Sequence, residues 1–171
     1  MPNINTKFSV SSFQQCDGTN FTTAGVDNSF KVGNGNLGVF TGVGATFDGK
    51  PMSAVIDFKG SMPYGESCVS AGFRVRNNLG ENSQTVQFRV QPATVTVPVG
   101  KNTSIYTTPY IAAKVNYKKG GVDTTVGNFT GVSTKIGKVN VFVEGQIYDV
   151  TKVNASTTSI NVGVSIPLNG K

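Results

Sequence analysis

The side chains of this sequence best suited to bind a partner are basic and amide groups on the polar positions of alternating segments. Arg74, Arg76 and Arg89 are followed by Lys114 and Asn116, and apolar residues flank each of them. If these segments are neighbouring strands, the five side chains form one basic, amide-rich sheet face. Such a face could lie against phosphates of a nucleic acid or against another acidic partner. The alternative is an ordinary solvated outer face.

Catalytic groups are scarce. The chain has no histidine and only nine acidic residues, which are scattered along it. Serine–histidine and cysteine–histidine catalysis are therefore excluded, and so are zinc sites of the usual types. Gly33–Gly38 matches a GxGxxG pattern, but a strand-like pattern follows it, whereas a dinucleotide site needs a helix there. We expect Glu144 to pair with a nearby Arg or Lys. The sequence predicts no enzyme, no cofactor and no metal site.

Two cysteines, Cys16 and Cys68, could form a disulfide in an oxidising compartment. Closing so long a loop would stabilise the fold by about 4 kcal/mol on the chain-entropy model. The other expectation is a pair of free thiols in a reducing compartment.

The elements that carry these residues are strands. From Leu37 onward apolar and polar residues alternate with a period of two, most clearly in a C-terminal hairpin over residues 139–168. Pro92 interrupts one such segment and predicts a bend or an edge there. No window has the 3.6-residue period of a helix. The length of the strands favours a barrel or a large jelly roll over a small sandwich.

The predicted fold is all-β, an antiparallel jelly roll or β-sandwich of about eight to ten long strands, with a closed up-and-down β-barrel as the alternative. Residues 1–35 are the least regular, and residues 13–28 are polar and rich in turn formers. We expect residues 1–35 to form an N-terminal arm or edge strands. Residues 36–171 would form the antiparallel β domain, so that the whole chain is a single domain.

Composition points to a structural protein. Only 14% of the 171 residues are charged, there are 21 glycines, and the formal net charge is +6. The proportion of charged residues is below the roughly 25% usual for soluble domains. A surface low in charge suits a protein that is covered by copies of itself or by partners. The N-terminus has no apolar segment typical of a signal peptide, so we expect use without such export, or a mature form with an added Met1.

Three strand segments resemble those of small outer-membrane β-barrels: residues 108–113, 143–148 and 160–165. The resemblance implies aliphatic side chains toward lipid and a polar, charge-paired lumen that contains Arg74, Lys114 and Glu144. The cysteine pair and the C-terminal alternation also resemble fimbrial subunits, which complete their sandwich with a donated strand.

We therefore expect a non-enzymatic structural protein that self-assembles. It would form homo-oligomers and contact other virion proteins. It would be a capsid, decoration, spike or tail protein of a phage or small virus, located in the virion. Nucleic acid would be contacted through the basic face. The alternatives are a small outer-membrane-type β-barrel, the one case with a membrane partner, and an extracellular fimbrial subunit or carbohydrate-binding module.

Overall fold

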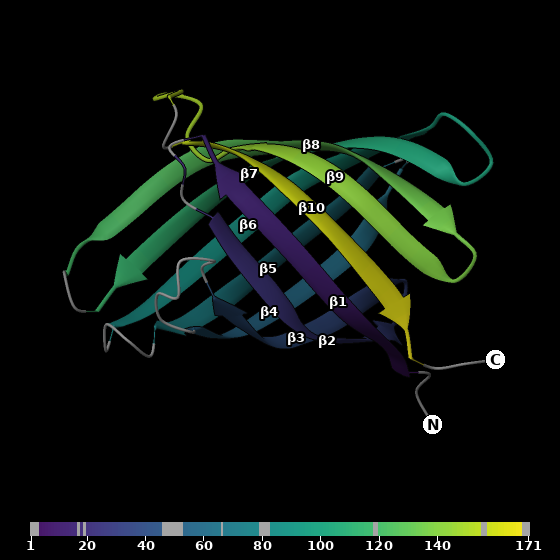
Figure 1. The fold of residues 1–171 in the computed structure, drawn as a ribbon, viewed down its shortest axis with the longest axis horizontal. Coiled ribbons are helices and arrows are strands. Elements are labelled where there is room, and N and C mark those ends of the chain that lie inside the picture. The colour runs from purple at the N-terminus through teal and green to yellow at the C-terminus, as the bar shows by residue number, and fades with distance from the viewer. Residues whose placement is uncertain are drawn as a thin grey trace.

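The computed structural model shows ten long antiparallel strands (Figure 1). It describes residues 4–16, 18, 20–45, 53–65, 67–78, 83–117, 120–154 and 157–168. The strands are β1 (Ile4–Gln15), β2 (Asn20–Val32), β3 (Gly35–Ala45), β4 (Ser53–Tyr64), β5 (Ser67–Asn78), β6 (Ser83–Pro98), β7 (Thr103–Asn116), β8 (Val122–Ile136), β9 (Val139–Ile147) and β10 (Thr158–Pro167).

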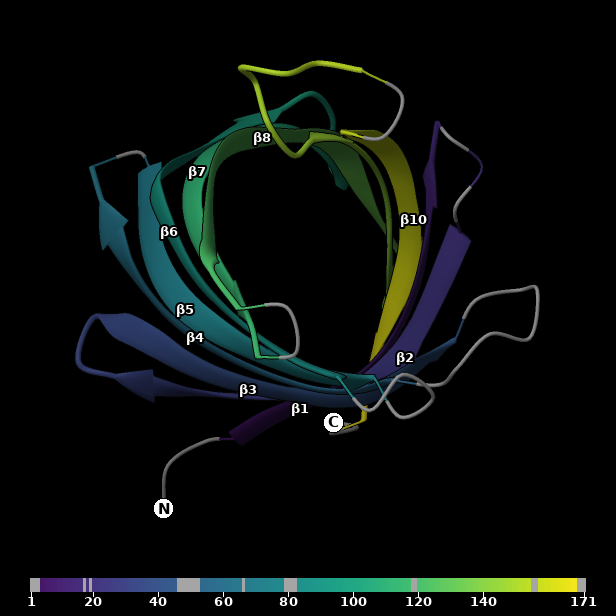
Figure 2. The same cartoon turned by 90° about the vertical axis from the view of Figure 1, so that its left-hand side faces the viewer.

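The strands close into one barrel. Each strand pairs with its neighbours in the sequence, and β1 pairs with β10 to complete the ring, which Figure 2 shows from one end. The alternative prediction, a closed up-and-down barrel, is confirmed. The preferred jelly roll or sandwich is wrong, because all the strands belong to a single closed sheet.

The interior of this barrel combines charged and polar side chains with a few aromatic ones. Successive side chains of a strand point to opposite faces, so the register assigns every second residue to the lumen. The buried residues on these positions include six polar ones, Ser53, Ser70, Thr85, Gln91, Thr108 and Ser159, beside Phe21, Val55, Tyr110, Ala112 and Phe129. A sandwich would instead bury the Val, Ile and Phe positions. Most of these positions lie on the outside of the ring, and this is the physical reason why the sandwich prediction fails.

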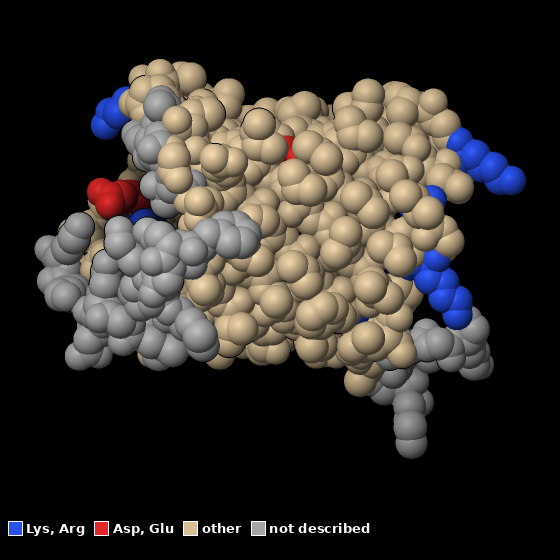
Figure 3. All heavy atoms as spheres, viewed as in Figure 1, with Lys and Arg blue, Asp and Glu red and all other residues tan. Residues whose placement is uncertain are grey.

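The outer face carries the apolar set. Many large apolar side chains point outward from the strands, and the most exposed of them range from Phe73 (37% exposed) to Tyr64 (75%). Phe58, Phe73 and Phe88 form a row across β4, β5 and β6, with ring centroids 4.8 Å and 6.0 Å apart. Figure 3 shows a wide uncharged band around the middle of the molecule, broken by one small acidic spot, with Lys and Arg gathered toward the two ends.

The two ends of the barrel differ. At the end that holds both termini, three hairpins turn through two residues each, and the first of these is a glycine at positive φ: Gly33 (57°), Gly65 (58°) and Gly137 (61°). Glycine is favoured in such turns because it adopts positive φ without steric cost. We call this the turn end. The opposite end, the loop end, carries longer connections, among them residues 148–157 between β9 and β10 (Figure 1).

The register is regular except at β6. Pairing between β6 and β7 shifts between Val90 and Val95, around Pro92, which has no N–H to donate. The bend predicted at this proline is confirmed.

The expectation of an N-terminal arm or edge strands in residues 1–35 is wrong. Strand β1 lies between β10 and β2, and β2 lies between β1 and β3, so both are full members of the closed sheet. The polar stretch before Asn28 is mostly strand because its lumen positions are occupied by residues such as Thr23, Gly25 and Asp27. In the described part of the chain, no helix has the length and apolar character needed to cross a membrane.

Candidate functional site

The lumen is the candidate site because the strands place their charges there. Every charged residue in the described strand positions falls on a lumen-facing position of the register. These residues are Lys7, Asp27, Lys31, Asp57, Lys59, Arg74, Arg76, Arg89, Lys114, Asp123, Lys135 and Glu144. Basic residues outnumber acidic ones in this set, so the lumen wall is on balance positive.

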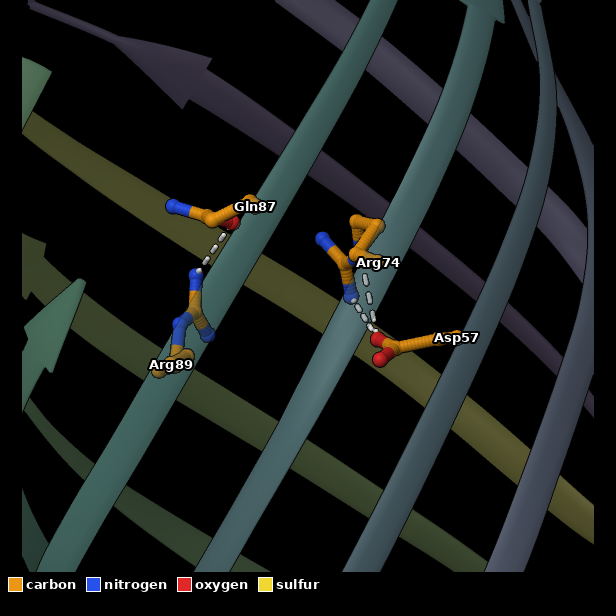
Figure 4. A network of polar contacts seen from close by, with 4 residues as sticks. All are labelled: Asp57, Arg74, Gln87 and Arg89. Carbon is orange, nitrogen blue, oxygen red and sulfur yellow. Dashed lines mark hydrogen bonds and ion pairs between the residues drawn. The ribbon is translucent and has the colours of Figure 1, made fainter. Parts of the chain in front are cut away.

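The densest part of this wall lies on β4, β5 and β6. One row of the sheet aligns Asp57, Arg74 and Gln87, and the register continues it to Lys114 on β7. Oδ2 of Asp57 accepts hydrogen bonds from Nε (3.0 Å) and Nη2 (2.5 Å) of Arg74 (Figure 4). Both groups are partly exposed to the lumen, so this is an ion pair in a wet, charged wall and not a dry buried one.

The next row aligns Lys59, Gly72 and Arg89. The guanidinium of Arg89 lies over the rings of Tyr110 and Phe129, 4.7 Å and 4.9 Å from their centroids, and these two rings stack on each other at 4.6 Å. Nη2 of Arg89 donates a long hydrogen bond of 3.4 Å to Oε1 of Gln87 (Figure 4). The aromatic pair therefore positions this cation through cation–π contacts.

A cavity of about 180 Å³ lies between these two rows. Its polar lining comes from Asp57, Lys59, Arg74, Gln87, Arg89 and Gln91, and Gly72 contributes to its wall. Several cationic and amide groups therefore converge on open space here.

Toward the loop end, side chains reach across the lumen. Arg76 on β5 lies over the ring of Phe21 on β2, 4.6 Å from its centroid, although two strands separate them in the sheet. Tyr148, just after β9, accepts a hydrogen bond from Oγ of Ser159 at 3.2 Å. Burial raises the pKa of Tyr148, while the Ser159 hydrogen bond and the nearby arginines act in the opposite direction.

The opposite wall holds Glu144 in a neutral network. The hydroxyl of Tyr106 donates to Oε2 of Glu144 at 2.9 Å, and Nε2 of Gln146 donates to Oε1 at 2.6 Å. The expected pairing of Glu144 with Arg or Lys is wrong: its described hydrogen-bond partners are a tyrosine and a glutamine. Its inward position is the one that the barrel resemblance implied.

The five residues predicted to share a face do so. Arg74 and Arg76 on β5, Arg89 on β6, and Lys114 and Asn116 on β7 all point to the same side of adjacent strands. That side is the lumen, however, and not an outer sheet face as expected. A nucleic-acid duplex cannot lie against a surface enclosed by a ring of ten strands, so the arrangement gives no support to a genome contact.

Sequence reasoning missed Asp57, Lys59, Gly72, Gln87 and Gln91 as members of this site. Each is on the same face as the arginines, and alternation from Ile56 and Phe58 already placed Asp57 and Lys59 there. Only the strand register shows that they meet. The glycine-rich Gly33–Gly38 motif is a hairpin turn followed by strand β3, so the dismissal of a dinucleotide site agrees with its conformation.

Of the two possibilities for the cysteines, a disulfide or free thiols, the structure has free thiols. Cys16 and Cys68 are both free; Cys16 is exposed at the loop end of β1, and Cys68 lies at the turn end of β5. A disulfide requires Cα atoms within about 7 Å. Residues at opposite ends of a barrel cannot meet that requirement.

No protein-family model matches this sequence, and no curated protein does. Among solved structures, the chain is similar to a de novo designed transmembrane β-barrel (11% identity, 96% of this chain and 95% of that one, TM-score 0.45). It is also similar to the β domain of the Bordetella autotransporter BrkA (9%, 96% and 98%, 0.47). A third is a KdgM porin in complex with disordered oligogalacturonate (11%, 95% and 97%, 0.44).

The chain also covers 64% of the length of OmpT, an outer membrane protein of Vibrio cholerae, at 11% identity and a TM-score of 0.41. These structural neighbours are β-barrels of membranes by name. Their scores are too low to carry an argument about this chain, so any assignment rests on its own geometry.

Proposed function

We propose that this protein spans a membrane as a β-barrel of the outer-membrane type. The observation that carries the proposal is the distribution of side chains in the described strands: every charged residue points to the lumen, and most of the large apolar residues point outward. A protein surrounded by water would expose its charges and bury its apolar groups. A barrel surrounded by hydrocarbon requires the reverse.

The dimensions of the strands agree with this environment. They contain 9 to 16 residues, and a tilted strand of about 9–11 residues crosses a bilayer. The closed sheet also satisfies the backbone hydrogen bonds without an edge, which hydrocarbon demands. The two outward-facing tyrosines, Tyr64 and Tyr117, lie at opposite ends of the barrel, where the membrane–water boundaries would be.

Short turns at one end and longer connections at the other are typical of outer-membrane barrels. In those barrels the longer loops lie on the extracellular side of the membrane. We assign the turn end of this barrel to the inner side of its membrane on that basis. In this proposal the protein remains non-enzymatic, and its functional compartment is the lumen.

The virion interpretation required apolar faces that pack together inside each subunit. In this barrel those faces are on the outside, where a particle subunit in water would aggregate. The apolar exterior therefore favours the membrane alternative over the virion component that we expected from composition.

A pair of matched variants tests the proposal. Val162 and Asn161 are neighbours near the middle of β10; Val162 is 45% exposed on the outer face, and Asn161 faces the lumen opposite Glu144. In a bilayer, Val162→Arg should lower the free energy of unfolding by about 2–4 kcal/mol, the cost of an arginine near the bilayer midplane. Asn161→Arg should be tolerated because its cation stays in the lumen beside Glu144.

The measurement is urea unfolding of both variants in lipid vesicles. Unfolding is monitored by circular dichroism and by the mobility of unboiled protein on a gel. Equal stability of the two variants would show that the outer face of β10 is not in contact with hydrocarbon, and would contradict the proposal.

A further inference from the structure

The cavity between Lys59 and Arg89 has the composition of an anion site. We propose that it binds one small oxyanion, a carboxylate or phosphate group, within the lumen. This inference rests on the proposed function, because the lumen is a separate aqueous compartment only if the outer face of the barrel is sealed by lipid.

Gly72 brings no side chain into the space for the anion. This residue lies between Lys59 and Arg89 in one row of the sheet, on the lumen face. Neighbouring strands are spaced by 4.7–4.9 Å, so the two basic residues stand about 10 Å apart at the backbone. With no side chain between them, their head groups can approach one anion from two sides.

The charge at this place is not neutralised by the protein. Asp57 is the one acidic residue that lines the cavity, and its Oδ2 already accepts two hydrogen bonds from Arg74. Within the described residues, neither Lys59 nor Arg89 has a carboxylate within the 4.0 Å of an ion pair. Two positive charges therefore face the cavity without a counter-charge of their own, which favours an anion.

Arg89 is prepared for this role. Its guanidinium is fixed over the Tyr110 and Phe129 rings, and its Nε is buried with no hydrogen-bond partner among the described residues. A buried N–H without a partner costs free energy, so the protein alone does not satisfy all the donors of this guanidinium. The planar fork of donors in arginine fits the paired oxygens of a carboxylate or phosphate.

Neutral donors complete the surroundings. Gln91 is buried, and its Oε1 accepts a hydrogen bond from Oγ of Ser70 at 2.5 Å, which leaves the N–H groups of the amide for the cavity. A volume of about 180 Å³ corresponds to about six water molecules at roughly 30 Å³ each. That is enough for one carboxylate or phosphate group with part of its hydration, and too little for a large polymer segment.

The test is calorimetric titration of the folded barrel in detergent with inorganic phosphate and, separately, with acetate. Wild-type protein should bind at least one of them. Arg89→Gln should weaken that binding at least tenfold, and Lys59→Gln severalfold. Lys135→Gln is the matched control, since it removes a lumen-facing cation on β8 that does not line the cavity; it should change the affinity by less than twofold.

Absence of binding by wild-type barrel to both anions would overturn the inference, and so would equal weakening in all three variants. If Arg89→Gln does not fold, the comparison of Lys59→Gln with Lys135→Gln decides in the same way. Folding is checked separately by the gel mobility of unboiled protein. A well-folded barrel that binds neither anion would contradict the site while leaving the membrane proposal intact.

Discussion

At the scale of single residues, the lumen wall is built from charges that neutralise each other only in part. Asp57 and Arg74 form a two-bond ion pair, whereas Glu144 is held by the neutral groups of Tyr106 and Gln146. Hydrogen bonds to charged groups contribute more to stability than neutral ones do. The pair and the network therefore stiffen two walls of a barrel whose interior contains few apolar contacts.

Removal of one charge from the Asp57–Arg74 pair should destabilise the barrel. We expect Asp57→Asn to lower the free energy of unfolding by about 1–2 kcal/mol, because Arg74 is left facing other cations but stays partly hydrated. The measurement is urea unfolding in detergent micelles. Arg74→Gln and the double variant complete a double-mutant cycle, and a coupling energy near zero would show that the ion pair contributes nothing.

The loop after β9 contains a carboxylate with an altered pKa. Two hydrogen bonds from Thr151, from its Oγ1 (2.6 Å) and its backbone N–H (2.9 Å), lower the pKa of Asp149 below its ordinary value of 3.8. Because the folded-state pKa is depressed, the loop gains stability above pH 3.8 and loses it as the pH falls through the folded-state value.

Thr151→Val removes the hydroxyl bond and should raise the pKa of Asp149 toward its ordinary value, as measured by carbon NMR of the labelled carboxylate. Thr130→Val, on the outer face of β8, serves as the control. An unchanged pKa in Thr151→Val would mean that the hydroxyl is not the cause of the shift.

At the scale of elements, an inward-pointing aromatic ring on one strand lies over a glycine on the neighbouring strand in several places. The ring of Phe142 on β9 covers Gly163 on β10, and Tyr106 on β7 similarly covers Gly131 on β8. An added Cβ at either glycine would collide with the ring. The aromatic side chains can thus lie flat along the wall, which keeps part of the lumen open and shields the glycine backbone.

Gly163→Ala should be destabilising by about 1–3 kcal/mol because the new methyl group overlaps the ring of Phe142. Gly145→Ala is the matched control on the outer face of β9, where the nearest atom to an added Cβ is the Thr130 oxygen at 3.8 Å, an ordinary contact. Denaturant unfolding in micelles compares them. Adding Phe142→Leu should restore part of the loss in Gly163→Ala; equal effects of the two alanines would refute this account.

How far the sequence could predict the structure also depends on the elements. Alternation from Leu37 onward predicted long antiparallel strands, and Pro92 predicted the irregularity in β6. Strand β2 was missed because its lumen positions carry Thr, Gly, Asp and Ser, which are typical of turns in a water-soluble protein. The site was predicted in part: a shared face for Arg74, Arg76 and Arg89 follows from alternation, but Asp57 and Gly72 join it only through the register.

At the scale of the whole molecule, alternation in the sequence does not determine whether the apolar face of the sheet points inward or outward. A period of two is the same whether that face packs against a second sheet or against lipid. The distinction comes from closure: once β1 pairs with β10, the charged set of side chains lies inside the ring and most of the aliphatic set lies outside it. Chain composition alone favoured a self-assembling particle because it does not show which side of the sheet is enclosed.

The two cysteines offer labels at opposite ends of the barrel. Cys16 is exposed at the loop end, and Cys68 lies at the turn end. In lipid vesicles, a polymer-coupled maleimide that cannot cross the membrane should reach only one of them in any given barrel. For the variants Cys68→Ser and Cys16→Ser, the fractions labelled from outside should therefore add up to about one. Complete labelling of both variants would mean that the barrel does not separate the two sides.

Folding in the presence and absence of lipid tests the membrane assignment most directly. Denatured protein should be diluted into buffer with or without lipid vesicles, and then compared by circular dichroism and by gel mobility before and after boiling. We predict a β-sheet spectrum and a heat-sensitive shift in mobility with vesicles, and aggregation without them. A monodisperse, fully β-folded protein in lipid-free and detergent-free buffer would contradict the assignment.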